Sequence, residues 1–188
     1  TAMAAVIGNA TALNAVVSSS TAMAAVAASQ TAMTAIVASP TAMTAIWRSN
    51  SAVAAVQKNT TAWKTFTGAT SAVMGKTVAI LANLNPADYA DMTAVAASQT
   101  AMTAVAASST AMTAIANAWS NTESAIVNSS IALNALKNSG KCQNVSKDVK
   151  GLAKATFISG LCFVFTAEIT VGGGACVIKA SRPTGGTE

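Results

Sequence analysis

Apolar and polar positions along this chain follow a ten-residue pattern. Fourteen repeats cover residues 1–140, with the consensus Thr-Ala-Met-x-Ala-Val/Ile-x-x-Ser-x. Position 2 is Ala in twelve repeats, and positions 3 and 6 are each apolar in twelve. Position 9 is Ser or Asn in ten. A fixed period of this kind is typical of a repeat architecture.

The spacing of the apolar positions favours helices over strands. A strand would place positions 3 and 6 on opposite faces. On a helix, positions 2, 3, 5 and 6 share one apolar arc, and positions 1, 4 and 8 share a more polar one. One continuous helix would let the apolar arc drift by about 80° per repeat, because ten residues fall short of three full turns. We therefore expect one short helix per repeat.

The ends of these helices are marked in the sequence. Ser or Asn at position 9 is a favoured N-cap, and Pro40 directly follows Ser39, at the first helical position where proline is tolerated. Each repeat then predicts a two-turn helix from position 10 to about position 7 of the next repeat. Such short helices need neighbours, and Ala at positions 2 and 5 would allow close approach. We predict a mainly α fold, an elongated zigzag or solenoid.

The predicted repeat core consists of the large apolar residues at positions 3 and 6 of the most regular repeats. These residues are Met23, Val26, Met33, Ile36, Met102, Val105, Met112 and Ile115.

Two segments, 61–90 and 117–124, depart from the repeat. In the first, Trp63 and Phe66 occupy the large positions, and we expect Gly75 and Pro86 to break the helix. One interpretation is an elbow or an aromatic plug in the shaft. The other is a contact patch for a partner.

Residues 141–188 form a second predicted region. Strand-like segments at 152–159, 161–171 and 175–181 surround a Gly-Gly-Gly turn. A hairpin centred on Gly173 would place Val177 opposite Ile169. We therefore predict a small antiparallel β segment that forms a C-terminal cap or tip.

Charge is sparse, which argues against several partners. The net charge is +5, but residues 1–47 carry no charged side chain. Following a nucleic-acid backbone takes about 6–10 phosphate contacts, so we expect no nucleic-acid partner. A membrane span needs about 20 predominantly apolar residues. Polar residues interrupt this chain every few positions, so we expect no span.

Candidate chemistry is also sparse. The chain has no histidine, which excludes Ser-His-Asp and Cys-His hydrolases and histidine-bearing zinc sites. We predict thiols rather than a zinc site at Cys142, Cys162 and Cys176, since no CxxC motif is present. We expect neither an enzyme nor a cofactor.

The densest basic run includes Lys147, Lys150 and Lys154. One interpretation is a solvated face. The other is contact with an acidic surface, such as lipopolysaccharide phosphate or an acidic protein.

The decapeptide, as it stands at 21–30 and 100–109, resembles the Ala/Thr-rich repeats of tailed-bacteriophage tail-fibre proteins. This resemblance implies a virion structural protein, located in an extracellular tail appendage, with a shaft that ends near the host-binding end. It also implies homotrimers, contacts with other tail proteins, and attachment to a host-surface glycan or protein. The chain starts inside a repeat without an initiator Met, so we expect a processed product or a piece of a longer protein.

Two other functions fit the repeat. A secreted bacterial adhesin or surface-layer protein would also use a long neutral shaft. Rows of Thr at positions 1 and 4 would suit an ice-binding protein.

Overall fold

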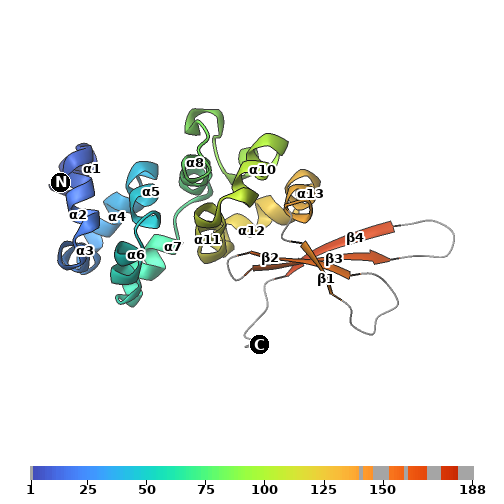
Figure 1. Cartoon of the computed structure of the whole chain (residues 1–188). Coiled ribbons are helices and arrows are strands. Elements are labelled where there is room, and N and C mark those ends of the chain that lie inside the picture. The colour runs from blue at the N-terminus through green and yellow to red at the C-terminus, as the bar shows by residue number, and fades with distance from the viewer. Residues whose placement is uncertain (1, 140–141, 146–152, 159–160, 169–174, 182–188) are drawn as a thin grey trace.

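In the computed structural model of the chain, residues 2–139, 142–145, 153–158, 161–168 and 175–181 are described. Short α-helices follow one another from the N-terminal end towards the strands (Figure 1). The helices are α1 Ala2–Ile7, α2 Ala10–Ser18, α3 Ser20–Ala27, α4 Gln30–Val37, α5 Pro40–Trp47, α6 Asn50–Gln57, α7 Thr60–Thr67, α8 Ser71–Leu81, α9 Met92–Ala96, α10 Gln99–Ala107, α11 Ser109–Asn117, α12 Trp119–Val127 and α13 Ser130–Lys137.

The helices begin and end where the repeat predicts. In α4, α5, α6 and α7 the helix runs from position 10 to position 7 of the next repeat, and the N-cap is position 9. The Ser39 hydroxyl accepts a 3.3 Å hydrogen bond from the Ala42 amide, and Pro40 occupies the first helical turn. The expectation of one capped, two-turn helix per repeat is confirmed for these four helices, but it fails at residues 82–91, where no α-helix forms.

From α1 to α5, each helix packs onto the helix three places further along the chain. α1 packs on α4, α2 on α5, α3 on α6, α4 on α7 and α5 on α8. The rule resumes with α8 on α11, α9 on α12 and α10 on α13. We call three consecutive helices a tier, so that α1–α3 form tier 1 and α4–α6 form tier 2. Three columns of helices result, and each tier takes about thirty residues.

The chain turns sharply between consecutive helices of a tier. α2 and α3 meet at 97°, so their apolar residues do not lie along one axis. Of the helices that the structure describes, none has by itself the length and apolarity to cross a membrane, and only this bent pair meets that test jointly.

The buried face is wider than the sequence indicates. Position 3 is buried from Met3 to Met43, as expected. Position 7 carries no assignment in the sequence pattern, yet it is buried at Val17, Ala27 and Trp47. Position 7 lies four residues after position 3, on the same side of the helix. The core face therefore comprises positions 2, 3, 6 and 7, with position 5 buried at only some repeats.

The stack is interrupted after α7. The expectation that Gly75 breaks a helix is wrong, because Gly75 lies inside α8 and is buried. α8 ends instead at Leu81, before Pro86, and Asn83 adopts φ 59° two residues beyond the end of the helix. The Asn83 and Leu84 amides donate to the Ile80 and Ala79 carbonyl oxygens, which is the Schellman pattern. A short 3-10 helix, η1 (Pro86–Asp88), then leads to α9.

This interruption leaves one column intact. α2, α5, α8 and α11 are stacked without a gap. Within residues 50–107 that the structure describes, α6 does not pack closely on α9, and α7 does not pack closely on α10. The second irregular segment has a smaller effect, since α12 follows α11 directly and only lacks a side-chain cap at Ala118.

Four strands are described beyond the helices: β1 Cys142–Val145, β2 Ala153–Ile158, β3 Leu161–Glu168 and β4 Ala175–Ser181. They pair antiparallel in the order β1-β2-β3-β4. The register opposes Val177 to Thr166, so the predicted pairing of Val177 with Ile169 is wrong. Ile169 and the Gly-Gly-Gly turn lie outside the described residues. The role of this segment as a cap or tip stays a prediction.

Candidate functional site

The predicted repeat core lies in the interior of the helical stack. Seven of the eight residues, Met23, Met33, Ile36, Met102, Val105, Met112 and Ile115, are at most 1% exposed. The eighth, Val26, is half-buried and packs against the same cluster.

The predicted basic contact lies mostly outside the described residues. Lys147 and Lys150 are not described. Lys154 is in β2, where its backbone is opposite Asn144 and Phe165. Contact of these lysines with an acidic surface therefore stays a prediction.

The aromatic residues of the irregular segment gather in the interior. Trp47 from α5 lies with its ring centroid 4.8 Å from that of Phe66 and 6.0 Å from that of Trp63, both on α7. Phe66 is fully buried and Trp63 is half-buried. Such ring pairs stabilise a core beyond simple burial. This arrangement favours the aromatic plug over a contact patch.

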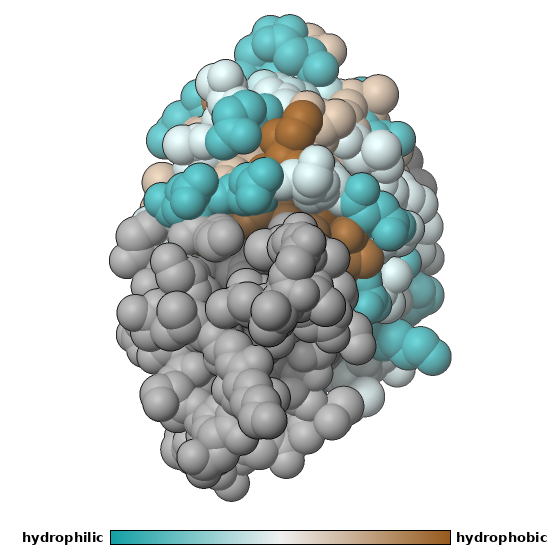
Figure 2. Space-filling model, turned by 90° about the vertical axis from the view of Figure 1, so that its right-hand side faces the viewer, coloured by the Kyte–Doolittle hydropathy of each residue, from teal (hydrophilic) through white to brown (hydrophobic). Residues whose placement is uncertain are grey.

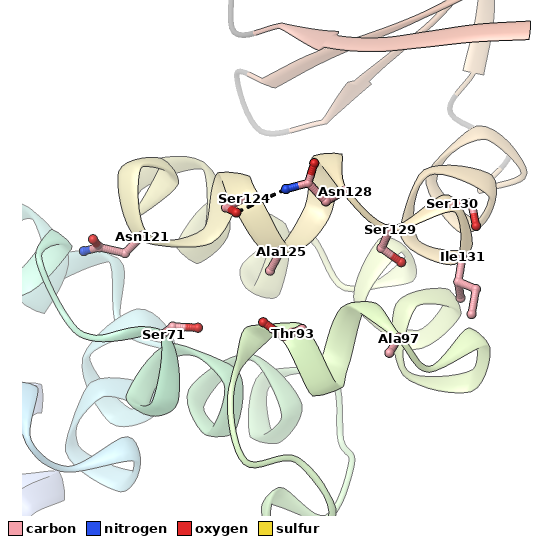
Figure 3. Close-up of a pocket in the computed structure, with 10 residues that line it drawn as sticks. All are labelled: Ser71, Thr93, Ala97, Asn121, Ser124, Ala125, Asn128, Ser129, Ser130 and Ile131. Atoms are coloured by element: carbon pink, nitrogen blue, oxygen red, sulfur yellow. Dashed lines mark hydrogen bonds between the residues drawn. The ribbon is translucent and has the colours of Figure 1, made fainter.

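A groove of about 540 Å³ with a largely polar lining lies between α9, α12 and the start of α13 (Figure 3). Its walls are built from serine, threonine, asparagine and alanine side chains, with one isoleucine. The lining residues are Ser71, Thr93, Ala97, Asn121, Ser124, Ala125, Asn128, Ser129, Ser130 and Ile131. We call this feature the α9–α12 groove.

Several of its polar groups are held by hydrogen bonds. The Asn128 side-chain amide donates to the Ser124 hydroxyl at 3.2 Å. The Asn121 side-chain amide donates to the Ala69 carbonyl oxygen at 3.1 Å, which ties α12 to the loop before α8. The Ser71 hydroxyl accepts from the Met92 amide at 3.3 Å. These bonds fix the groove walls on three separate helices.

The chemistry of the α9–α12 groove is that of neutral hydrogen bonding. No acidic, basic or thiol side chain lines it, so its walls provide neither a nucleophile with a base nor a charge for a metal or phosphate. Hydroxyls and amides both donate and accept. Such a lining suits a neutral ligand that carries hydroxyl groups rather than an ionic ligand.

The sequence carried a signal for this groove. Asn121, Ser124 and Asn128 are spaced three and four residues apart and lie on one helix face. The pattern of the repeat contained this polar arc, but not the packing of α12 on α9 that turns it into a groove wall.

A second groove of about 560 Å³ lies between α3 and α6, with Thr21, Ser51 and Asn59 in its lining. The grooves thus recur along one column.

Among the residues coloured in the view of Figure 2, most are hydrophilic or neutral, and a few are hydrophobic. Ile131 lies at the edge of the α9–α12 groove and is 36% exposed. Among the residues whose exposure the structure describes, it is the one exposed large hydrophobic residue. Within the described part of the chain, no three His, Cys, Asp or Glu residues lie close enough to hold a metal ion.

Comparison with known proteins gives no relative. No protein family model, no curated protein and no solved structure matches this chain.

Proposed function

We propose that this chain is a structural component of a viral, specifically phage, tail fibre. Its decapeptide repeats would form a solenoid shaft in an extracellular tail appendage. The C-terminal β segment would serve assembly with other tail proteins or attachment to a glycan or protein of the host surface.

The observation that carries the proposal is the packing of each helix on the third helix along the chain. This geometry repeats from α1 to α8 and again from α8 to α13. In a solenoid each repeat contacts only its neighbours, so length can grow without a larger core. A shaft needs this property, whereas a compact binding domain does not.

The surface of the shaft supports the same function. Between α1 and α5 the described helices carry no charged residue. The α9–α12 groove and the groove between α3 and α6 are lined mainly by Ser, Thr, Asn and Ala, with Lys58 as the charged side chain among their lining residues. A surface with so little charge has little to steer association with ionic partners. It suits a spacer whose contacts are made at its ends.

Immunogold labelling of the phage particles produced by a genome that encodes this chain would test the proposal. Gold on the tail appendages of phage particles, with the chain detected in purified particles by mass spectrometry, is the expected result. A pre-immune serum is the control. Label on bacterial envelopes with none on particles would replace the proposal with the adhesin or surface-layer function.

The alternative function, ice binding by rows of threonine, has a separate test. Thr103 and Thr113, at position 4, donate their hydroxyls to the Gln99 and Ser109 carbonyl oxygens of their own helices. These bonds engage the donor that an ice lattice would need. Thermal hysteresis of the purified chain would nevertheless favour ice binding over the shaft.

A further inference from the structure

The α9–α12 groove and the groove between α3 and α6 occupy equivalent places in the stack. Each lies between two helices that pack on each other and are three places apart along the chain. In the repeats that start at residues 51 and 121, the same positions line the two grooves, namely positions 1, 4, 5, 8 and 9. The two grooves therefore allow a direct comparison of their side chains.

The side chains at two of these positions differ in chemistry between α12 and α6. Position 4 is Ser124 in the α9–α12 groove, where the other groove has Ala54. Position 8 is Asn128, where the other groove has Lys58. The α9–α12 groove thus has an additional hydroxyl on this wall, and an amide takes the place of the ammonium group. Its hydrogen-bonding groups are therefore all uncharged.

Position 1 departs from the repeat twice in the lining of the α9–α12 groove. This position is Thr or Ser in ten of the fourteen repeats, but it is Asn121 in one repeat of this groove and Ile131 in the next. Asn121 adds an amide to the α12 wall. Ile131 is 36% exposed and adds an apolar surface at the edge of the groove, where Ala97 and Ala125 also contribute to the lining. The groove therefore combines amides and hydroxyls with a small apolar surface.

The side chains of the lining retain hydrogen-bonding capacity for a ligand. A side-chain amide has two N–H donors and one carbonyl acceptor, and a hydroxyl both donates and accepts. The bond from Asn128 to Ser124 uses one Asn128 N–H and leaves the Ser124 hydroxyl hydrogen to donate. Thr93, which lies across the groove from α12 in Figure 3, and Ser130 are exposed as well. A ligand that pairs with this lining needs several closely spaced donors and acceptors and no charge.

An oligosaccharide without charged groups meets these requirements. Each of its hydroxyls donates and accepts, and the C–H face of a sugar ring is apolar enough to lie against Ile131. The volume of about 540 Å³ lies within the range of about 300–1,000 Å³ that is usual for small-molecule sites. An acidic sugar would find no basic side chain among the lining residues, and a cationic ligand would find no carboxylate.

We propose that the α9–α12 groove binds a neutral oligosaccharide through the hydroxyls and amides of its walls. This inference rests on the lining of the groove and does not depend on the proposed function. The immunogold result and the sugar-binding result are therefore separate, and either can fail without the other.

Binding of the full chain to an array of immobilised oligosaccharides tests the proposal. Neutral oligosaccharides of hexoses and N-acetylhexosamines are the probes, and sialylated and sulfated oligosaccharides on the same array are the ionic comparison. We expect the chain to bind neutral probes. Isothermal titration calorimetry with the soluble form of the neutral oligosaccharide that binds best then gives the dissociation constant.

The comparison of the two grooves supplies the variants. The double variant Ser124→Ala/Asn128→Lys gives the α12 wall the residues of α6 at two exposed positions. It should raise the dissociation constant at least about tenfold, because it removes two hydrogen-bonding groups. Ile131→Thr restores a usual residue of position 1 and should weaken binding by a smaller factor. Thr21→Ala removes an exposed hydroxyl from the other groove and should leave the dissociation constant unchanged.

Three results would overturn the proposal. The first is an array on which the chain binds no neutral oligosaccharide. The second is binding that is confined to the sialylated or sulfated probes. The third is an unchanged dissociation constant in the double variant, with a circular dichroism spectrum that shows it to be folded. If the double variant does not fold, an unchanged dissociation constant in Ile131→Thr has the same meaning.

Discussion

The Ser129 hydroxyl joins two helices that are far apart in sequence. It accepts a 3.1 Å hydrogen bond from the Ala132 amide at the start of α13, and it donates a 2.6 Å bond to the Ala96 carbonyl oxygen at the end of α9. Ser108 forms the same bridge between α11 and the Leu81 carbonyl oxygen of α8. One hydroxyl thus caps a helix and satisfies a carbonyl of another.

Ser129→Ala should therefore cost more than an ordinary cap substitution. Loss of an N-cap costs about 1 kcal/mol, and the unpaired Ala96 carbonyl adds roughly 1–2 kcal/mol. Ser29→Ala is the matched control, because the Ser29 hydroxyl caps α4 and is exposed. Urea unfolding of both variants measures the difference. Equal losses would mean that the bridge contributes nothing.

Gly75 of α8 lies directly against the backbone of Asp91, the N-cap residue of α9. A Cβ added at Gly75 would lie 2.2 Å from the Asp91 carbonyl carbon, which is backbone and cannot rotate away. Gly75→Ala should lower the free energy of unfolding by roughly 3 kcal/mol or more.

Gly8→Ala is the control for that substitution. The nearest atom to its added Cβ is the Ala4 carbonyl oxygen at 3.5 Å, an ordinary contact. The variant should be neutral or more stable by up to about 1 kcal/mol, since alanine restricts the unfolded chain. A Gly75→Ala protein that melts at the wild-type temperature would contradict the close approach.

Two fully buried threonines should respond with opposite sign to loss of their hydroxyls. The Thr77 hydroxyl has no hydrogen-bond partner, and Thr77→Val should stabilise the protein by about 1 kcal/mol. The Thr122 hydroxyl lies within hydrogen-bond distance of three carbonyl oxygens, those of Ile115, Ala118 and Trp119. Thr122→Val should destabilise by about 1 kcal/mol. Melting temperatures that shift in the same direction would refute the assignment.

Alanine at position 2 is more tightly packed than alanine at position 5. Ala101 is fully buried in α10, whereas Ala104 is half-buried. Ala101→Leu should cost about 1–3 kcal/mol through overpacking, and Ala104→Leu less than about 1 kcal/mol. Guanidinium unfolding curves compare the pair, and a larger loss at Ala104 would reverse the assignment of the two positions.

The local features of the fold could be predicted from the sequence, whereas the stacking of the helices could not. The period, the caps and the apolar arc depend on local geometry, so helix bounds such as Gln30–Val37 could be predicted. The number of helices per tier depends on the turn angle between helices, which no residue type in the repeat determines. Position 7 was missed because its residue type varies between repeats, although Val17 and Trp47 lie on the same side of the helix as position 3 and are buried.

The α9–α12 groove illustrates the same limit at the level of function. The polar arc of α12, with Asn121 and Asn128, was present in the sequence. Its partner wall at Thr93 lies on a five-residue helix after the break, and only the resumed stacking of α12 on α9 brings the two together. The polar composition of the groove walls could be predicted from the sequence, but the packing that shapes them into a groove could not.

The single unbroken column has a mechanical consequence. Force applied along the molecule between its first seven helices and its last five passes mainly through the packing of α5 on α8, since α6 does not pack closely on α9 and α7 does not pack closely on α10. A molecule whose helices are packed without a gap along one column resists stretching along that column, and it bends more easily on the side where the helices are not packed. The side formed by α6 and α7 is therefore where the molecule should flex first under load.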